Sequence, residues 1–216
     1  MSMLGLLEDF DLWAGILGFL ITFLIAIFSL YSYKLSKHRN QLFFSAGFLL
    51  VALGWLAGVI FNTYTEFEER QVLLRGYVQL PYALGGLLML HMLLIIAGYL
   101  TIFIVNEKLK SRKTMFLLYL FAVFSVLVAH DFYFLYHLTV FFILSLVVNH
   151  CAWLYKEQRS TNSLLILLGF SGLLLSHGIM MFTPFSQEFY VTGNFIQIIS
   201  FAVLLWALVR IYKRKQ

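Results

Sequence analysis

The sequence predicts an all-α integral membrane protein, a seven-helix bundle that consists almost entirely of bilayer spans. Three observations predict this class: 62% of the 216 residues are apolar, only 12% are charged, and the apolar residues gather into long uninterrupted runs. An ordinary soluble domain is about half apolar and about a quarter charged, so this chain could not bury its hydrocarbon in a soluble fold. The composition also excludes intrinsic disorder, and the single cysteine, Cys151, excludes a disulfide framework.

Seven runs are long enough to cross a bilayer, because a helix needs about 20 apolar residues to span a hydrocarbon core of about 30 Å. They cover residues 12–33, 41–61, 80–105, 114–130, 131–155, 163–183 and 189–211. Membrane strands are excluded, since they would alternate polar and apolar residues over about 10 positions. We therefore expect residues 1–216 to form a single transmembrane domain.

The charged residues predict the orientation of this bundle. Thirteen of the 15 Lys and Arg residues flank the runs on one side, and eight of the ten Asp and Glu residues flank them on the other. Because basic loops stay in the cytoplasm, we expect a multi-pass protein of the cell membrane with its N-terminus outside and its C-terminus in the cytoplasm. This pattern indicates contact with the lipid bilayer and not with nucleic acid. The basic inner loops are the expected contact for a cytoplasmic or membrane protein partner.

The sequence also predicts the structure of two connections between spans on the outer side. His130 and Asp131 lie at the tip of a tight hairpin between the fourth and fifth runs. Residues 62–79 form the longest predicted loop, and their apolar residues favour a short amphipathic helix on the membrane surface.

A shift of 122 residues aligns two parts of the chain with each other. It pairs Tyr33-Lys34 with Tyr155-Lys156 and Gly47-Phe48 with Gly169-Phe170. A shift of 108 residues pairs Tyr82 with Tyr190 and Gly85 with Gly193. We interpret residues 12–105 and 131–211 as parallel repeats of three spans, joined by the fourth span, because an odd linking helix keeps both halves in the same orientation.

This plan of three, one and three spans resembles two known heptahelical families. Rhodopsin-like bundles bind retinal through a lysine in the last span, but every lysine here lies in a loop. SWEET-type sugar transporters carry Pro-Gln pairs in their first and fifth spans, whereas Pro81 and Pro184 lie at outer span ends here. The resemblance therefore implies the arrangement of helices and neither ligand.

The last two runs are similar to a group of uncharacterised archaeal multi-pass membrane proteins with seven helices. The similar positions are Gly169-Phe170, Ser176-His177, Tyr190 to Asn194, Gln197 and Trp206 to Arg210. Where that group has Gly-His, this chain has Gly193-Asn194. The resemblance suggests an archaeal source and implies no activity.

Histidine is the ionisable residue that the predicted span interiors contain, and such residues are expensive to place in a membrane unless they have a function. At 1.5 Å per residue, His137 and His177 lie about 9 Å below the outer surface and His91 about 15 Å below it. With His130 and Asp131 at the outer edge, these residues predict a pocket in the outer half, formed by the third, fifth and sixth runs.

Four interpretations of this pocket stay open. The histidines could hydrogen-bond to neighbouring helices and support packing, or they could sense protons. His130, His137 and His177, with Asp131, offer a ligand set for zinc or another transition metal. His137 and His177 offer the two axial ligands of a haem.

Simpler roles are expected for the other polar and small residues. We expect Asn62 and Asn194 to cap helices, and Gln197 is a candidate pocket residue. Gly54 and Gly58 have the four-residue spacing of closely packed membrane helices. No catalytic residue is identified, since nothing in the sequence obviously lowers the pKa of Cys151, no oxyanion donor is visible and no nucleotide or nucleophile motif is present.

We therefore expect a small protein that binds a ligand or cofactor, resembles a sensor or receptor, and is not an enzyme. A small-solute transporter is the first alternative, although the inner halves of the runs are strongly apolar and count against a path across the membrane. A haem- or metal-binding protein, either an electron carrier or a metal-dependent hydrolase, is the second alternative.

Overall fold

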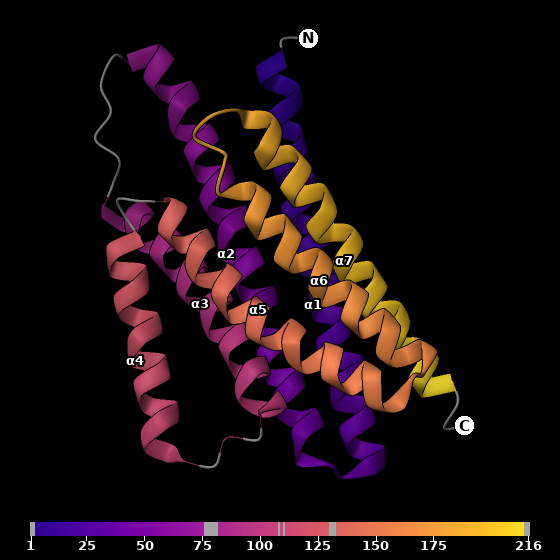
Figure 1. The fold of residues 1–216 in the computed structure, drawn as a ribbon. Coiled ribbons are helices and arrows are strands. Elements are labelled where there is room, and N and C mark those ends of the chain that lie inside the picture. The colour runs from indigo at the N-terminus through magenta and orange to yellow at the C-terminus, as the bar shows by residue number, and fades with distance from the viewer. Residues whose placement is uncertain (1–2, 76–81, 108, 110, 130–132, 214–216) are drawn as a thin grey trace.

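The computed structural model is helical throughout the residues that it describes, which are 3–75, 82–107, 109, 111–129 and 133–213. Seven helices follow one another in this part of the chain, and Figure 1 shows them running alternately up and down. Their bounds are α1 Met3–Ser36, α2 Arg39–Arg75, α3 Tyr82–Asn106, α4 Arg112–Ala129, α5 Tyr133–Gln158, α6 Thr161–Met180 and α7 Gln187–Lys213. The prediction of an all-α bundle is confirmed.

Six of the helices, all except α4, are long and apolar enough to cross a membrane. Within lipid the backbone must satisfy its own hydrogen bonds, which a helix does internally. Many large apolar side chains are exposed on the outside of the bundle, where lipid would contact them. Helix α4 has 18 residues and begins with Arg112 and Lys113, so a seventh crossing remains a prediction.

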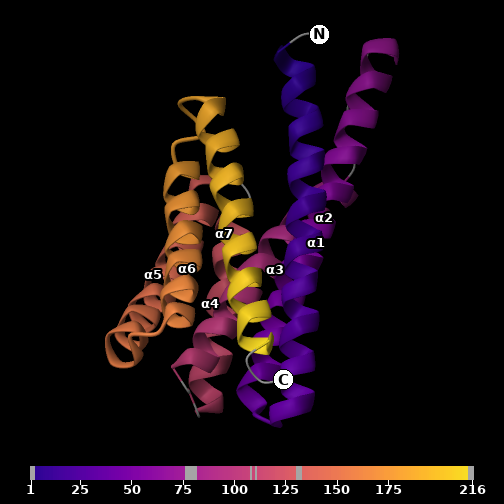
Figure 2. The same cartoon turned by 90° about the vertical axis from the view of Figure 1, so that its right-hand side faces the viewer.

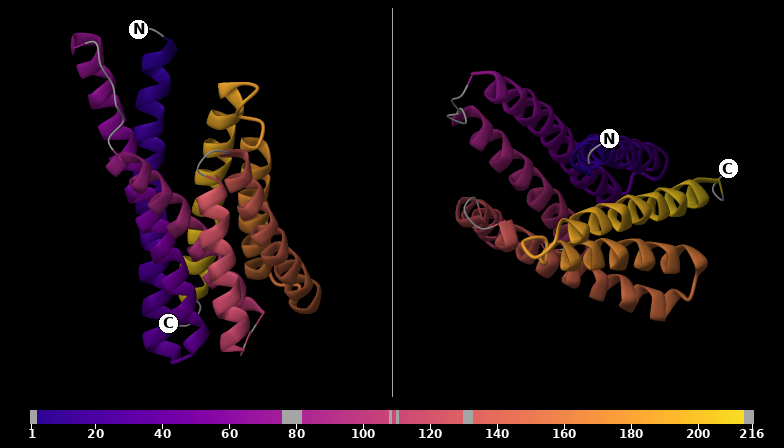
Figure 3. Two further views of the ribbon diagram at one scale, coloured as in Figure 1. Left: turned by 90° about the vertical axis from the view of Figure 1, so that its left-hand side faces the viewer. Right: turned by 90° about the horizontal axis from the view of Figure 1, so that it is seen from above.

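The six long helices form a closed ring. Neighbouring helices pack in the order α1, α2, α3, α5, α6 and α7, and α7 returns to α1. Figure 2 and the right-hand view of Figure 3 show α1–α3 and α5–α7 as two groups on opposite sides. Helix α4 packs outside the ring against α3 and α5, and Thr101 Oγ1 lies 2.8 Å from Tyr119 Oη at this contact.

Two predicted features of the outer side differ from the structure. Residues 62–75 do not form a loop, because α2 continues without interruption to Arg75. The predicted cap Asn62 consequently lies inside a helix. Asn194 also lies inside a helix, two turns after the start of α7 at Gln187. The predicted hairpin tip, His130 and Asp131, lies outside the described residues.

The turns α1–α2 and α5–α6 have the same local geometry. Lys37 and Arg159, which are 122 positions apart, have positive φ angles of 58° and 45°. The Lys37 amide donates to the Tyr33 carbonyl and the Arg159 amide to the Tyr155 carbonyl, each at 2.8 Å. A residue in the left-handed region commonly ends a helix in this way.

Small residues allow close packing between helices, as predicted for Gly54 and Gly58. A Cβ atom on Gly58 would lie 2.9 Å from His91 Nδ1, and one on Gly54 would lie 3.3 Å from the His91 carbonyl oxygen. The same approach occurs between α6 and α7, where a Cβ atom on Gly193 would lie 3.2 Å from the Ser176 carbonyl oxygen. Gly54 and Ser176 are 122 positions apart, whereas His91 and Gly193 are 102 apart. The predicted repeat pairs α3 with α7 at a shift of 108, and it stays a prediction.

Among the described glycines, Gly98 lies closest to backbone atoms of a neighbouring helix. A Cβ atom on Gly98 would lie 2.7 Å from the Gly47 carbonyl oxygen and 3.0 Å from the Val51 amide nitrogen. Because backbone atoms cannot move aside, Gly98→Ala should lower the free energy of unfolding in detergent by about 1–3 kcal/mol.

Gly86→Ala is the matched control on the same helix, since a Cβ atom there would have nothing within 4 Å. This control should leave stability unchanged or raise it by up to about 1 kcal/mol, because alanine favours helix. Equal melting temperatures for the two variants would contradict the close packing of α2 and α3.

Candidate ligand cavity

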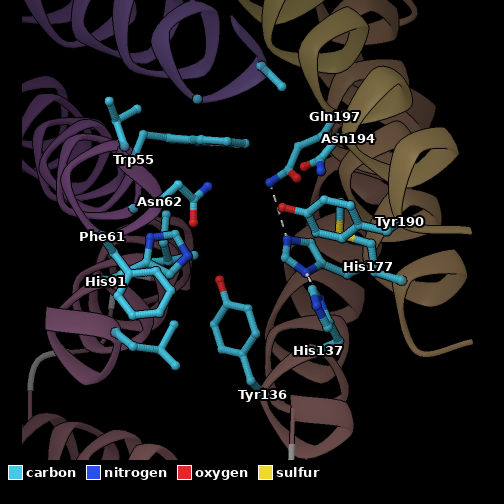
Figure 4. Close-up of a pocket in the computed structure, with 17 residues that line it drawn as sticks. Trp55, Phe61, Asn62, His91, Tyr136, His137, His177, Tyr190, Asn194 and Gln197 are labelled. Carbon is cyan, nitrogen blue, oxygen red and sulfur yellow. Dashed lines mark hydrogen bonds between the residues drawn. The ribbon is translucent and has the colours of Figure 1, made fainter. Parts of the chain in front are cut away.

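A cavity of about 260 Å³ lies between the two groups of helices, toward the predicted outer side. All six ring helices contribute residues to its wall. Figure 4 shows side chains of α2 and α3 on one side and side chains of α5, α6 and α7 on the other. His91, His137, His177 and Gln197 were predicted to line one pocket, and the structure brings these four residues to this cavity.

His137 and His177 form a direct pair between α5 and α6. Their Nδ1 atoms are 3.0 Å apart, and the two residues are 2% and 1% exposed. A hydrogen bond between two ring nitrogens needs one nitrogen to donate and the other to accept. The equal depth predicted for these residues therefore corresponds to a contact between their rings.

Gln197 extends this pair to α7. Its Nε2 atom lies 3.4 Å from His177 Nε2. When this amide donates, a neutral His177 carries its proton on Nδ1 and donates it to His137. The order of donation is then Gln197 to His177 to His137, as assigned from the geometry of the hydrogen bonds.

His91 lies across the cavity from this pair (Figure 4). Its Nδ1 atom lies 2.7 Å from the Gly54 carbonyl oxygen, an acceptor, so Nδ1 must carry the proton. The neutral ring then has an accepting lone pair at Nε2. Helix packing thus fixes which nitrogen of His91 can accept a hydrogen bond.

Tyr136 lies between the three histidines and was not predicted as a site residue. Its ring centroid is 4.8 Å from that of His137, and it is 6.2 Å from His91 and 6.1 Å from His177. Figure 4 shows its hydroxyl group directed into the cavity. Its position next to His137 in the chain was the one feature of the sequence that could have indicated Tyr136 as a site residue.

Four further residues with polar groups complete the wall and were not predicted as site residues: Trp55, Asn62, Tyr190 and Asn194. The predicted capping role of Asn62 and Asn194 is wrong, because both lie within helices and line the cavity. Trp55 is 9% exposed, and within the described structure its buried Nε1 atom has no hydrogen-bond partner.

The cavity wall contains polar groups but no Asp, Glu, Lys or Arg among its described lining residues. An ion without a partner is costly to bury in such surroundings. The predicted Asp131 and His130 lie outside the described residues, so the structure does not place them at the cavity.

The distance within the histidine pair bears on the metal and haem interpretations. Two imidazoles on opposite sides of a metal ion would hold their nitrogens about 4 Å apart, since each bond is about 2 Å long. His137 and His177 instead lie within hydrogen-bond distance. Among the described residues, no three His, Cys, Asp or Glu side chains are placed to hold a metal ion. The predicted metal ligands also include His130 and Asp131, which lie outside the described residues.

Comparison with protein-family models, curated proteins and solved structures finds no match to this chain. The function must therefore be argued from the chemistry of the cavity.

A double-mutant cycle should detect the histidine pair. His137→Ala and His177→Ala should each lower the free energy of unfolding by about 1–3 kcal/mol, because each removes a buried hydrogen-bond partner. The two effects should fail to add, with a coupling of about 0.5–3 kcal/mol measured by denaturation in detergent.

The matched control combines His177→Ala with His38→Ala, because His38 is exposed. Those two effects should add. Additive effects for His137 and His177 would show that their rings do not interact.

Proposed function

We propose that this protein binds a small uncharged solute with several hydrogen-bonding groups in the outer cavity, and that it acts as a sensor or receptor. The observation that supports this proposal most is the convergence of polar groups from five helices, α2, α3, α5, α6 and α7, on one space. His137, His177, Asn194 and Gln197 are each at most 4% exposed, and all four line this cavity. Burying polar groups is costly unless they are hydrogen-bonded.

The absence of charged residues among the described wall residues supports an uncharged solute. An anion would need a cationic or dense donor site, and a cation would need carboxylates. Neutral imidazoles, amides and phenols instead offer donors and acceptors together. This set suits hydroxyl and amide groups, which also donate and accept.

The dimensions and surfaces of the cavity support a small solute. Its volume of about 260 Å³ is below the range of about 300–1,000 Å³ that is common for drug-sized ligands. Trp55 and Phe61 supply apolar faces (Figure 4), so a compact molecule with both polar groups and carbon–hydrogen faces fits the wall. The buried Trp55 Nε1 donor is one group that such a solute could satisfy.

Matching features of the two halves support the proposed repeat of three, one and three helices. The two positive φ angles and their 2.8 Å hydrogen bonds recur at a spacing of 122 residues. The helix pairs α1–α7 and α5–α3 would exchange under a two-fold rotation between the halves. In the proposed cell-membrane orientation, with the N-terminus outside, the histidine cavity faces the exterior.

The basic inner loops support the proposed sensor role, because a sensor needs a surface that contacts a signalling partner. Lys37, Arg39 and Arg159 lie at the turns α1–α2 and α5–α6, whereas the residues of α1, α2, α5 and α6 that line the histidine cavity lie toward the other ends of these helices. A change in the packing of the ring on ligand binding would reach these turns through α2 and α6. We propose that a cytoplasmic or membrane protein partner contacts them.

A thermal-shift panel on the protein in detergent tests the ligand class. The probes are erythritol and N-methylacetamide as neutral compounds, acetate and tetramethylammonium as ions, and zinc chloride as a metal. At a concentration of ten times Kd, a neutral probe should stabilise the protein by about 1.4 kcal/mol. His177→Ala and Gln197→Ala should abolish this effect, whereas His38→Ala should preserve it.

Stabilisation by acetate or tetramethylammonium but by neither neutral compound would contradict the proposed ligand class. Stabilisation by zinc that disappears in His177→Ala would favour the metal interpretation in its place.

A further inference from the structure

A second cavity lies at the other end of the same ring. It has a volume of about 310 Å³, and all six ring helices again contribute to its wall. Its polar residues are Asn40, Gln41, Asn106 and His150. The sequence counted against a transporter because the inner halves of the spans are apolar, but these four residues bring polar groups to the inner end.

A buried apolar layer separates the two cavities. On α2, Trp55 lines the outer cavity and Phe48 lines the inner one, and on α7 Gln197 and Leu204 do the same. Seven residues of helix correspond to about 10 Å. Val51, Leu173 and Phe201 lie between these levels and are each 0% exposed. A solute could therefore not pass from one cavity to the other through this layer as it stands.

Hydrogen bonds join helices within each half of the ring. Ser45 Oγ donates to the Ala26 carbonyl at 2.7 Å between α2 and α1, and His91 binds Gly54 between α3 and α2. In the other half, His177 is bonded to both neighbouring helices through His137 and Gln197. Such bonds fix the geometry of each group of three helices.

Aromatic contacts connect the two halves across the layer. Trp55 and Phe201 have ring centroids 6.4 Å apart, as do Phe48 and Phe170. Tyr99 and His177 are 6.1 Å apart. These contacts depend mainly on shape and apolar area, and a polar contact also joins the halves at the inner end, where His150 Nδ1 lies 3.3 Å from Glu107 Oε1. The backbones of the two halves approach closely along only two helix pairs in the described structure, α1 with α7 and α3 with α5.

From these observations we infer that the protein transports its small neutral solute by alternating access. The halves α1–α3 and α5–α7 rock against each other around the buried apolar layer, so that the outer and inner cavities open in turn. Rocking of two repeats about a site at their interface is a general mechanism of membrane transport. The solute class rests on the proposed function, whereas the motion rests on the two cavities and the layer between them.

Distances between paired spin labels test this motion in the full-length protein in liposomes. The background is Cys151→Ala, which removes the single cysteine of the chain. One pair, Thr63→Cys with Thr192→Cys, reports on the outer ends of the two halves, and His38→Cys with Glu157→Cys reports on their inner ends. All four positions are exposed.

Each pair should give two distances, one for the open and one for the closed end. Leu88→Trp places bulk in the outer cavity, and Leu208→Trp places it in the inner cavity. Leu88→Trp should shift the outer pair to the longer distance and the inner pair to the shorter one. Leu208→Trp should produce the opposite shifts, which a general loss of structure would not do.

Trp13→Cys with Thr63→Cys is the control, because both positions lie in the half α1–α3 and should keep one distance in every variant. A single unshifted distance at both ends would overturn the inference, and so would the same shift in both tryptophan variants. If this occurred while neutral probes still stabilised the protein, binding would stand without transport. Opposite shifts without binding of any neutral probe would refute the solute class alone.

Discussion

The structure depends on the cost of leaving a polar group without a partner in hydrocarbon. Lipid offers no hydrogen bonds, so the backbone closes into helices and the polar side chains must find partners inside the bundle. The outer surface accordingly carries residues such as Phe116 and Phe121 of α4, which are 67% and 60% exposed. The interior carries His137, His177 and Gln197, which are hydrogen-bonded to one another. One constraint thus determines both the lipid-facing surface and the composition of the cavity.

Six helices in a ring cannot fill their own centre with backbone, so side chains decide what remains open. At the middle level, fully buried residues such as Val51, Leu173 and Phe201 close the ring. Toward each end, a cavity remains between the side chains of the six helices. The outer and inner cavities are therefore consequences of the same arrangement, and the proposed binding and transport functions use the two ends and the layer between them.

Hydrophobic run length predicted every helix, because the bilayer imposes a minimum length that few other constraints modify. Helix ends were less predictable: residues 62–75 continue α2 instead of forming a loop. That error also led to the wrong role for Asn62, since a polar residue near a presumed span end looks like a cap. His91, His137, His177 and Gln197 were predictable as a group because depth follows from position in a span.

The remaining site residues depend on helix rotation and contact, which depth alone does not determine. Trp55 and Tyr136 could not be distinguished from the many other aromatic residues of this chain, which is 18% aromatic. The inner cavity was missed because Asn40 and Gln41 lie beside a basic turn, where polar residues are expected without any function. The recurrence of the left-handed turn at Arg159 was hidden as well, since lysine and arginine do not suggest a positive φ angle.

The contact between the two histidine rings is the point at which the proposed cavity can be tested most sharply. In protein labelled with ¹⁵N histidine, a scalar coupling across the hydrogen bond should connect Nδ1 of His137 with Nδ1 of His177. Substitution of either residue should remove the coupling, and substitution of the exposed His38 should leave it intact. Two uncoupled rings, both in contact with lipid protons, would contradict a histidine cavity inside the bundle, on which the proposed function rests.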